Sequence, residues 1–117
     1  MGTIRITDLK LRTIIGINDW EREELQDVKI NLQIEFDETA SIQSDDIKDT
    51  IDYKTLSKEI IRFVEHAEFF LLEKLTAGVL DIIMKSPKVR SASVRIDKPQ
   101  ALRFSESVSV ELSRSKE

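Results

Sequence analysis

Apolar residues recur at helical spacing in two stretches in the middle of the chain. In the stretch from Phe69 to Met84, the apolar stripe consists of Leu72, Leu75, Val79, Ile82 and Ile83. Intervals of three and four residues place these side chains on one face of an α-helix. A second stripe, preceded by Asp52 as the expected N-cap, consists of Leu56, Ile60, Ile61, Phe63 and Val64. The pattern therefore predicts two consecutive amphipathic helices.

Alternating apolar residues, the pattern of a half-buried strand, flank the two helices. From Val28 to Phe36 the alternation is strict. From Ile4 to Ile17 the apolar positions change from even to odd numbers near Thr7-Asp8, which predicts a β-bulge. The polar stretch that follows the second strand contains a turn or short helix start at Ser44–Asp46. Two further strands are expected near the end of the chain, at residues 92–96 and 108–112.

The predicted order β-β-α-α-β-β indicates an α+β fold, with a four-stranded antiparallel sheet and two helices on one face. A chain of 117 residues is expected to form a single domain, residues 1–117. Such a sheet has two open edges, which invite pairing with another copy of the chain. Closing several sheets into a barrel removes these edges, so we expect a homo-oligomer.

Composition and charge narrow the function classes. The net charge of −4, with interspersed charges and no basic patch, argues against a nucleic-acid partner. No apolar run approaches the roughly 18 residues of a membrane span, and the N-terminus lacks a signal-peptide pattern, so we expect a cytoplasmic protein without a membrane partner. The chain has no cysteine and one histidine, His66, so we expect neither a thiol nucleophile nor a zinc site.

Two glutamates invite a functional interpretation. Glu73 aligns with Ala77, Leu80 and Met84 on a flank of its helix that is otherwise apolar. A carboxylate there needs hydrogen-bond partners, and a ligand with two adjacent N–H donors would supply them. The alternative, which periodicity alone favours, is a boundary glutamate that pairs with a lysine or reaches water. Glu21 lies beside Trp20 in a polar loop, and from its neighbours alone we expect a solvated side chain.

Lys98 and Tyr53 are the other residues singled out. In the register of the strand at residues 92–96, Lys98 faces the same side as the apolar residues. Desolvation could keep it neutral, an acidic neighbour could hold it charged, or it could reach solvent at the strand end. Tyr53 stands alone at a helix start, where a tyrosine usually serves packing.

Several segments, in this order and at these spacings, resemble the dihydroneopterin aldolases and their relatives, the dihydroneopterin triphosphate 2′-epimerases. They are Gly16–Glu21, Gln26, Ser44–Asp46, Ile51–Tyr53, Leu71–Leu75 and Val94–Pro99. The segments 9–13, 71–76 and 96–109 look like the epimerase branch, whereas the run Asp19–Glu21 looks like the aldolases. The aldolases commonly follow their lysine-proline pair with a glycine-containing segment that leads into the last strand. This chain has no glycine there, so we favour the epimerase branch.

The resemblance implies the tunnelling fold (T-fold), in which four subunits share a barrel and two rings stack into an octamer. Pterin pockets would lie between neighbouring subunits. Glu73 would hold the amino-pyrimidinone N–H edge of the pterin with two hydrogen bonds. This role replaces the interpretation of Glu73 as a boundary glutamate. The backbone near Leu72, and the backbone near Ile51 of a neighbouring subunit, would complete the contacts to the pterin. Tyr53 of the neighbour would lie beside the ring and take part in proton transfer.

The resemblance also implies retro-aldol chemistry on dihydroneopterin or its triphosphate, with the pterin's own ring imine as electron acceptor. No metal, cofactor or lysine Schiff base is then required. Lys98 and Glu21 would carry the proton transfers, through an ordered water. Re-addition of the retained aldehyde would invert the 2′ carbon and give the dihydromonapterin form. Arg103 would contact the triphosphate tail, unless it is simply a surface arginine.

Two alternatives remain beside the epimerase. One is a dihydroneopterin aldolase of folate biosynthesis, which releases 6-hydroxymethyl-7,8-dihydropterin and glycolaldehyde. The other is a non-catalytic oligomer that binds pterins. The zinc-dependent pterin enzymes of the same fold are not expected, because a single histidine does not make their metal site.

Overall fold

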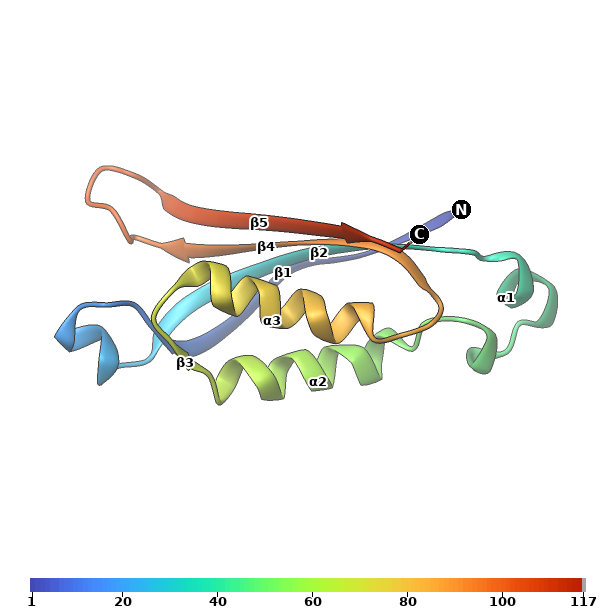
Figure 1. Ribbon diagram of the computed structural model, residues 1–117, viewed down its shortest axis with the longest axis horizontal. Helices are drawn as coiled ribbons and strands as arrows, with labels where there is room; N and C mark the ends of the chain where they lie inside the picture. Colours follow the sequence, from blue (N-terminus) through green and yellow to red (C-terminus); the bar gives the residue numbers. More distant parts are fainter. Residues whose placement is uncertain (117) are drawn as a thin grey trace.

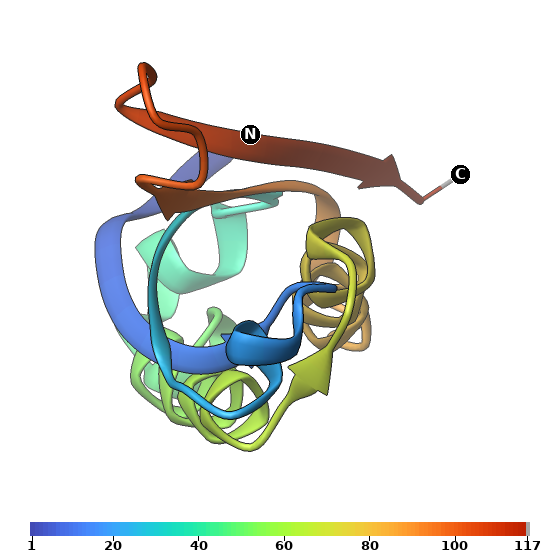
Figure 2. The same ribbon diagram turned by 90° about the vertical axis from the view of Figure 1, so that its left-hand side faces the viewer.

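The computed structural model describes residues 1–116, which form a curled sheet with helices on its concave face (Figure 1). The strand order across the sheet is β3 (Glu68–Phe69), β1 (Gly2–Ile15), β2 (Gln26–Phe36), β4 (Val89–Pro99) and β5 (Ser107–Ser115). In the end-on view the sheet bends around the two long helices (Figure 2). The molecule is elongated, with extents of 52 × 24 × 23 Å, so its two ends are far apart. No helix within residues 1–116 is long and apolar enough to cross a membrane.

The four predicted strands are present and pair antiparallel along the sheet. They are β1 (Gly2–Ile15), β2 (Gln26–Phe36), β4 (Val89–Pro99) and β5 (Ser107–Ser115). The predicted bulge is confirmed, because the β1–β2 register shifts between Ile6 and Leu9, and Asp8 has a φ of 55°. β1 ends two residues earlier than predicted, since the chain turns at Gly16, where φ is 130°.

A fifth strand, β3 (Glu68–Phe69), was not predicted. It pairs in parallel with the end of β1, Ile14 opposite Glu68 and Ile15 opposite Phe69. The sheet is therefore mixed rather than purely antiparallel. Two residues carry no periodic pattern, so the sequence alone assigned Phe69 to the following helix. The pairing exists because the connection between the two long helices passes along the free edge of β1.

The two long helices are α2 (Tyr53–Glu65) and α3 (Leu72–Met84). The expected N-cap is confirmed, because the Asp52 carboxylate accepts hydrogen bonds from the backbone N–H groups of Lys54 and Thr55 at 3.1 and 3.2 Å. A short helix, α1 (Thr39–Ser44), and a 3₁₀ turn, Ile47–Asp49, fill the polar stretch before α2.

The core lies between α3, α2 and the concave face of the sheet. All five residues of the predicted α3 stripe are buried, as are Ile60 and Val64 of α2. From the sheet, the buried residues include Val28, Ile30, Leu32 and Ile34 of β2 and Ala92, Val94 and Ile96 of β4. Burial of these alternating residues fixes which face of β4 points inward, and Lys98 lies on that face near the strand's end.

Candidate active site

A cavity of about 320 Å³ lies at one end of the molecule, where the ends of β1 and β4 meet the start of α3. It is lined by Gly16, Ile17, Asn18, Trp20, Glu21, Gln26, Phe70, Leu71, Leu72, Lys98, Gln100 and Ala101. Two predicted catalytic residues, Glu21 and Lys98, and one predicted substrate contact, Leu72, are therefore brought together within one chain.

Glu21 is 4% exposed, so the expectation of a solvated loop glutamate was wrong. It lies in the 3₁₀ turn Asp19–Arg22, which follows the reversal of the chain at Gly16. This reversal folds the carboxylate back over the end of β1 instead of letting it project into solvent. Its burial depends on backbone geometry and on partners distant in the sequence, which local polarity does not reveal.

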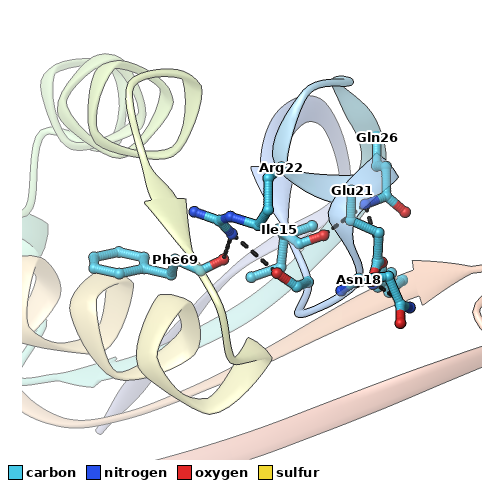
Figure 3. Close-up of polar contacts among 8 residues, drawn as sticks. Ile15, Asn18, Glu21, Arg22, Gln26 and Phe69 are labelled. Carbon is cyan, nitrogen blue, oxygen red and sulfur yellow. Dashed lines mark hydrogen bonds and ion pairs between the residues drawn. The ribbon is translucent and has the colours of Figure 1, made fainter.

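Four donors hold the Glu21 carboxylate, and Figure 3 shows those of Asn18 and Gln26. Oε1 accepts hydrogen bonds from the backbone N–H of Asn18 at 3.1 Å and from its side-chain amide at 2.8 Å. Oε2 accepts one from the Gln26 side-chain amide at 3.2 Å and one from the Lys98 ammonium. Burial raises the pKa of Glu21, but these hydrogen bonds and the charge of Lys98 outweigh it and lower the pKa to about 2. Glu21 is therefore a fixed negative charge at neutral pH.

Lys98 has an acidic neighbour, Glu21, which is one of the environments considered from the sequence. Its side chain is only 15% exposed and pairs with Glu21. A lysine ammonium has three N–H donors, and Glu21 is the one side chain within residues 1–116 that accepts from it. The remaining donors are available to a ligand in the cavity. The arrangement can therefore deliver a hydrogen bond or a proton at a defined point.

Asn18 and Gln26 support the site, although the sequence assigned them no role. Gln26 also donates to the backbone carbonyl of Ile15, so its amide bridges β1 and Glu21. Asn18 precedes Glu21 by three residues, and a glutamate that reaches back to the N-cap N–H is half of a capping box. The spacing of three residues could have predicted the contact between Asn18 and Glu21 from the sequence. The contact between Gln26 and Glu21 could not be predicted in this way, because it depends on how the turn folds.

Glu73 lies in the first turn of α3, next to Leu72, and its side chain is exposed. No ion pair to Glu73 is present within residues 1–116, so in a single chain it reaches water rather than a lysine. Of its apolar flank, Leu80 is buried, and Ala77 and Met84 are half-buried. Glu73 is thus the exposed neighbour of Leu72, which lines the cavity, but it is not itself part of the lining.

Ile51 and Tyr53 lie far from Lys98, because the start of α2 points away from the end of β4 (Figure 1). They flank the start of α2, whose 13 residues span about 20 Å. Ile51 lines a separate cavity of about 610 Å³ together with residues from the end of α3 and Lys88. Tyr53 is 58% exposed. One chain therefore does not bring Tyr53 or Ile51 to the cavity that holds Lys98.

Arg103 lies in the loop between β4 and β5, and its side chain is exposed. Its guanidinium lies 5.4 Å from the ring centroid of Phe104, which is itself 95% exposed. The first residues of this loop, Gln100 and Ala101, line the cavity, but Arg103 does not. Arg103 therefore follows two lining residues in the same loop but does not belong to the lining.

Comparison with known proteins agrees with this geometry. Residues 4–113 match the sequence profile of the dihydroneopterin aldolase (FolB) family. A dihydroneopterin triphosphate 2′-epimerase from Pseudomonas aeruginosa is 48% identical over 112 residues, covering 96% of this chain and 91% of that protein. A dihydroneopterin aldolase from Escherichia coli is 28% identical over 117 residues, covering 97% of this chain and 93% of that protein.

The fold agrees as well. The crystal structure of the E. coli dihydroneopterin aldolase in complex with neopterin superimposes with a TM-score of 0.92 at 25% identity, covering 98% of this chain and all of that one. This confirms the α+β tunnelling fold expected from the resemblance. With the family profile matched over nearly its whole length, and with its fold shared, the chain belongs to the dihydroneopterin aldolase family of enzymes.

Proposed function

We propose that this chain is an enzyme that epimerises the 2′ carbon of dihydroneopterin triphosphate by retro-aldol cleavage and re-addition, with some aldolase activity. The observation that carries the proposal is the largely buried Lys98–Glu21 pair. Both residues line a cavity whose lining also includes Leu72, the first residue of α3. Sequence identity supports the epimerase rather than the aldolase, since it is 48% with the P. aeruginosa epimerase and 28% with the E. coli aldolase.

In this proposal Glu73 binds the pterin and the N-terminus of α3 positions it. The Glu73 carboxylate accepts two parallel hydrogen bonds from the amino-pyrimidinone edge, the geometry in which a carboxylate is strongest. Its exposure and its lack of an ion-pair partner within residues 1–116 leave it available for this contact. The backbone near Leu72, which lines the cavity, completes one side of the match.

The reaction then needs a base and an acid. A base removes the proton of the 2′-hydroxyl, the bond between C1′ and C2′ breaks, and its electron pair enters the ring imine, whose nitrogen takes up a proton. Glu21 is ionised and accepts four hydrogen bonds, so it positions Lys98 instead of exchanging a proton itself. Lys98 supplies the proton at the ring nitrogen, through water, and Tyr53 takes part in the transfer at the side chain.

The site is completed by a neighbouring subunit. Ile51 and Tyr53 are separated from Lys98 by the length of α2, so within the proposed mechanism they must come from another copy. The strands at the two sheet edges, β3 and β5, leave the sheet open for such an assembly. We expect a ring of four subunits around a shared barrel, and two rings stacked as an octamer. Residues 1–117 act as one pterin-binding domain in the cytoplasm.

Arg103 is the candidate contact for the triphosphate. It lies on the loop whose first residues line the cavity, and it is exposed. A guanidinium forms strong, geometrically defined hydrogen bonds with phosphate oxygens. A tethered triphosphate retains the aldehyde fragment in the site, which favours re-addition over release.

A dihydroneopterin aldolase is the second candidate. The same Lys98–Glu21 geometry supports cleavage, and the E. coli aldolase solved with neopterin shares the whole fold. Product analysis with dihydroneopterin and its triphosphate, offered separately, distinguishes the two. Mainly 2′-inverted triphosphate supports the epimerase, whereas rapid release of glycolaldehyde from the unphosphorylated compound supports the aldolase. Binding of pterins without turnover of either compound would leave only the non-catalytic oligomer.

A further inference from the structure

Arg22 joins the two walls of the cavity, which are the turn from Gly16 to Arg22 beside Lys98 and the segment from β3 to the start of α3. It does so through three backbone carbonyls, and Figure 3 shows its contact with Phe69. Its Nη1 donates to the carbonyl oxygens of Gly16 and Phe69, both at 3.0 Å. Its Nη2 donates to the carbonyl oxygen of Glu68. Gly16 belongs to the turn that carries Glu21, whereas Glu68 and Phe69 form β3, which leads directly into α3. One side chain thus connects segments about 50 residues apart in the sequence.

Few other hydrogen bonds join these two regions, and one of them is the buried bond from the Thr13 hydroxyl to the Ala67 carbonyl at 3.0 Å. The backbone pairing between β1 and β3 covers only two residue pairs, and it is extended by one hydrogen bond from the Gly16 N–H to the Phe69 carbonyl at 3.3 Å. A two-residue strand at a sheet edge is weak by itself. At the start of α3, Leu71 provides no side-chain cap. Burial of Leu72 and Leu75 packs the start of α3 onto the core, and the three Arg22 hydrogen bonds add a polar link between this start and the turn that carries Glu21.

The guanidinium also lies over an aromatic ring. Its central carbon is 4.0 Å from the ring centroid of Phe70, which lines the cavity. A planar guanidinium can stack on a ring and donate in its own plane at the same time, which a lysine ammonium cannot do. Arg22 therefore fixes the orientation of Phe70 as well as the separation of the two backbones.

We infer that Arg22 is a positioning residue, whose hydrogen bonds to Gly16, Glu68 and Phe69 hold the Lys98–Glu21 wall in register with the Leu72–Glu73 wall. The inference rests on the proposed function, because it assigns binding to one wall and proton transfer to the other. A pterin bound to Glu73 moves with α3. Its reacting side chain meets Lys98 only if α3 and the Glu21 turn keep their relative placement, and a misplacement of about 1 Å can cost about 100-fold in rate.

The test compares Arg22→Met with Arg12→Met. Methionine keeps the length and apolar stem of arginine but removes every donor. Arg12 is a matched control, since it donates to the carbonyl of Leu25 at the other end of the same loop and pairs with Asp27 without lining the cavity. We would measure kcat and KM, the Kd for neopterin, and hydrogen exchange by mass spectrometry over residues 13–18 and 66–72.

For Arg22→Met we expect kcat to fall about 10- to 100-fold, because the reacting groups lose alignment. The Kd for neopterin should stay within about threefold, since the Glu73 contact travels with α3. Exchange in both segments should rise about tenfold as the contact between the walls opens. Arg12→Met should leave all these quantities unchanged. Arg22→Lys, which keeps the charge near Phe70 and can reach one carbonyl, should fall between wild type and Arg22→Met.

A variant that is less stable to heat but keeps wild-type kcat and wild-type exchange in both segments would overturn the inference, because Arg22 would then serve stability alone. A parallel loss of kcat and of neopterin affinity would also overturn it. If Arg22→Met does not fold, Arg22→Lys decides by the same criteria. If the wild-type protein turns over neither compound, the proposed function fails, and the exchange data still decide whether Arg22 joins the two segments.

Discussion

The carboxyl group of Glu21 rests directly on the backbone of Gly16. A β-carbon added at Gly16 would lie 2.2 Å from the carboxyl carbon of Glu21 and 2.3 Å from each of its oxygens. Gly16 also has a φ of 130°, a conformation that L side chains rarely adopt. Glycine at this position therefore allows both the turn at the end of β1 and the close seat of the carboxylate that holds Lys98.

Substitution of Gly16 by alanine should damage stability and catalysis together. For Gly16→Ala we expect the free energy of unfolding to fall by about 2 kcal/mol from backbone strain, with turnover reduced at least about tenfold because Glu21 is displaced from Lys98. Urea unfolding and steady-state kinetics measure the two effects. Gly2→Ala is the control, since a β-carbon at Gly2 would come no closer than 3.1 Å to a neighbouring atom, in the Phe36 ring, and Gly2 does not line the cavity. Wild-type turnover in Gly16→Ala would show that catalysis does not require the Glu21 carboxylate to lie against the backbone of residue 16.

The depressed pKa of Glu21 predicts a specific dependence of stability on pH. Burial raises this pKa, but the hydrogen bonds from Lys98, Asn18 and Gln26 bring it from 4.5 to about 2. Because the folded state binds the proton less well than the unfolded state, Glu21 contributes stability above pH 4.5 that is lost as the pH falls towards 2.

We therefore expect Glu21→Gln to flatten the loss of stability between pH 5 and pH 3 relative to wild type. Urea unfolding at several pH values in this range measures the slope. Glu23→Gln, an exposed neighbour in the same loop, should keep the wild-type slope. Equal slopes for wild type and Glu21→Gln would mean that the four hydrogen bonds to Glu21 do not hold its ionised form in solution.

Binding and turnover should separate between the two walls of the cavity. For Glu73→Gln we expect the affinity for neopterin to fall about 100-fold or more, because the amide places a donor against the pterin donors. For Lys98→Ala we expect kcat to fall about 1,000-fold while the Kd changes little, as is typical for loss of a proton-transfer group. Isothermal titration and steady-state kinetics measure both quantities.

Two controls on exposed positions of α3 accompany these variants. Asp81→Asn and Lys74→Ala lie outside the cavity lining and should behave as wild type in both assays. An unchanged neopterin affinity in Glu73→Gln would remove Glu73 as the pterin anchor. A Lys98→Ala protein that loses affinity as much as turnover would make Lys98 a binding residue.

The parts of this structure that follow from sequence are those determined by burial of a repeating face. The α3 stripe from Leu72 to Ile83 and the alternation in β2 were predicted because the same face stays buried over many residues. The environment of Glu21 was not predictable from its neighbours, since its partner Lys98 is 77 residues away and the turn depends on Gly16. Resemblance to a family singled out Glu21 and Lys98, but not Arg22, whose hydrogen bonds all go to backbone carbonyls.

The separation of Tyr53 from Lys98 predicts complementation between two inactive variants. If each site takes Lys98 from one subunit and Tyr53 from its neighbour, Lys98→Ala and Tyr53→Phe inactivate different halves of it. Random assembly of equal amounts then restores about a quarter of the sites, because half the subunits carry an intact Lys98 and half of their neighbours carry an intact Tyr53. Mixing after denaturation and refolding, followed by kinetics, measures this. Each variant refolded alone is the control. Mixtures no more active than the separate variants would place Tyr53 outside the reaction or within the same subunit's site.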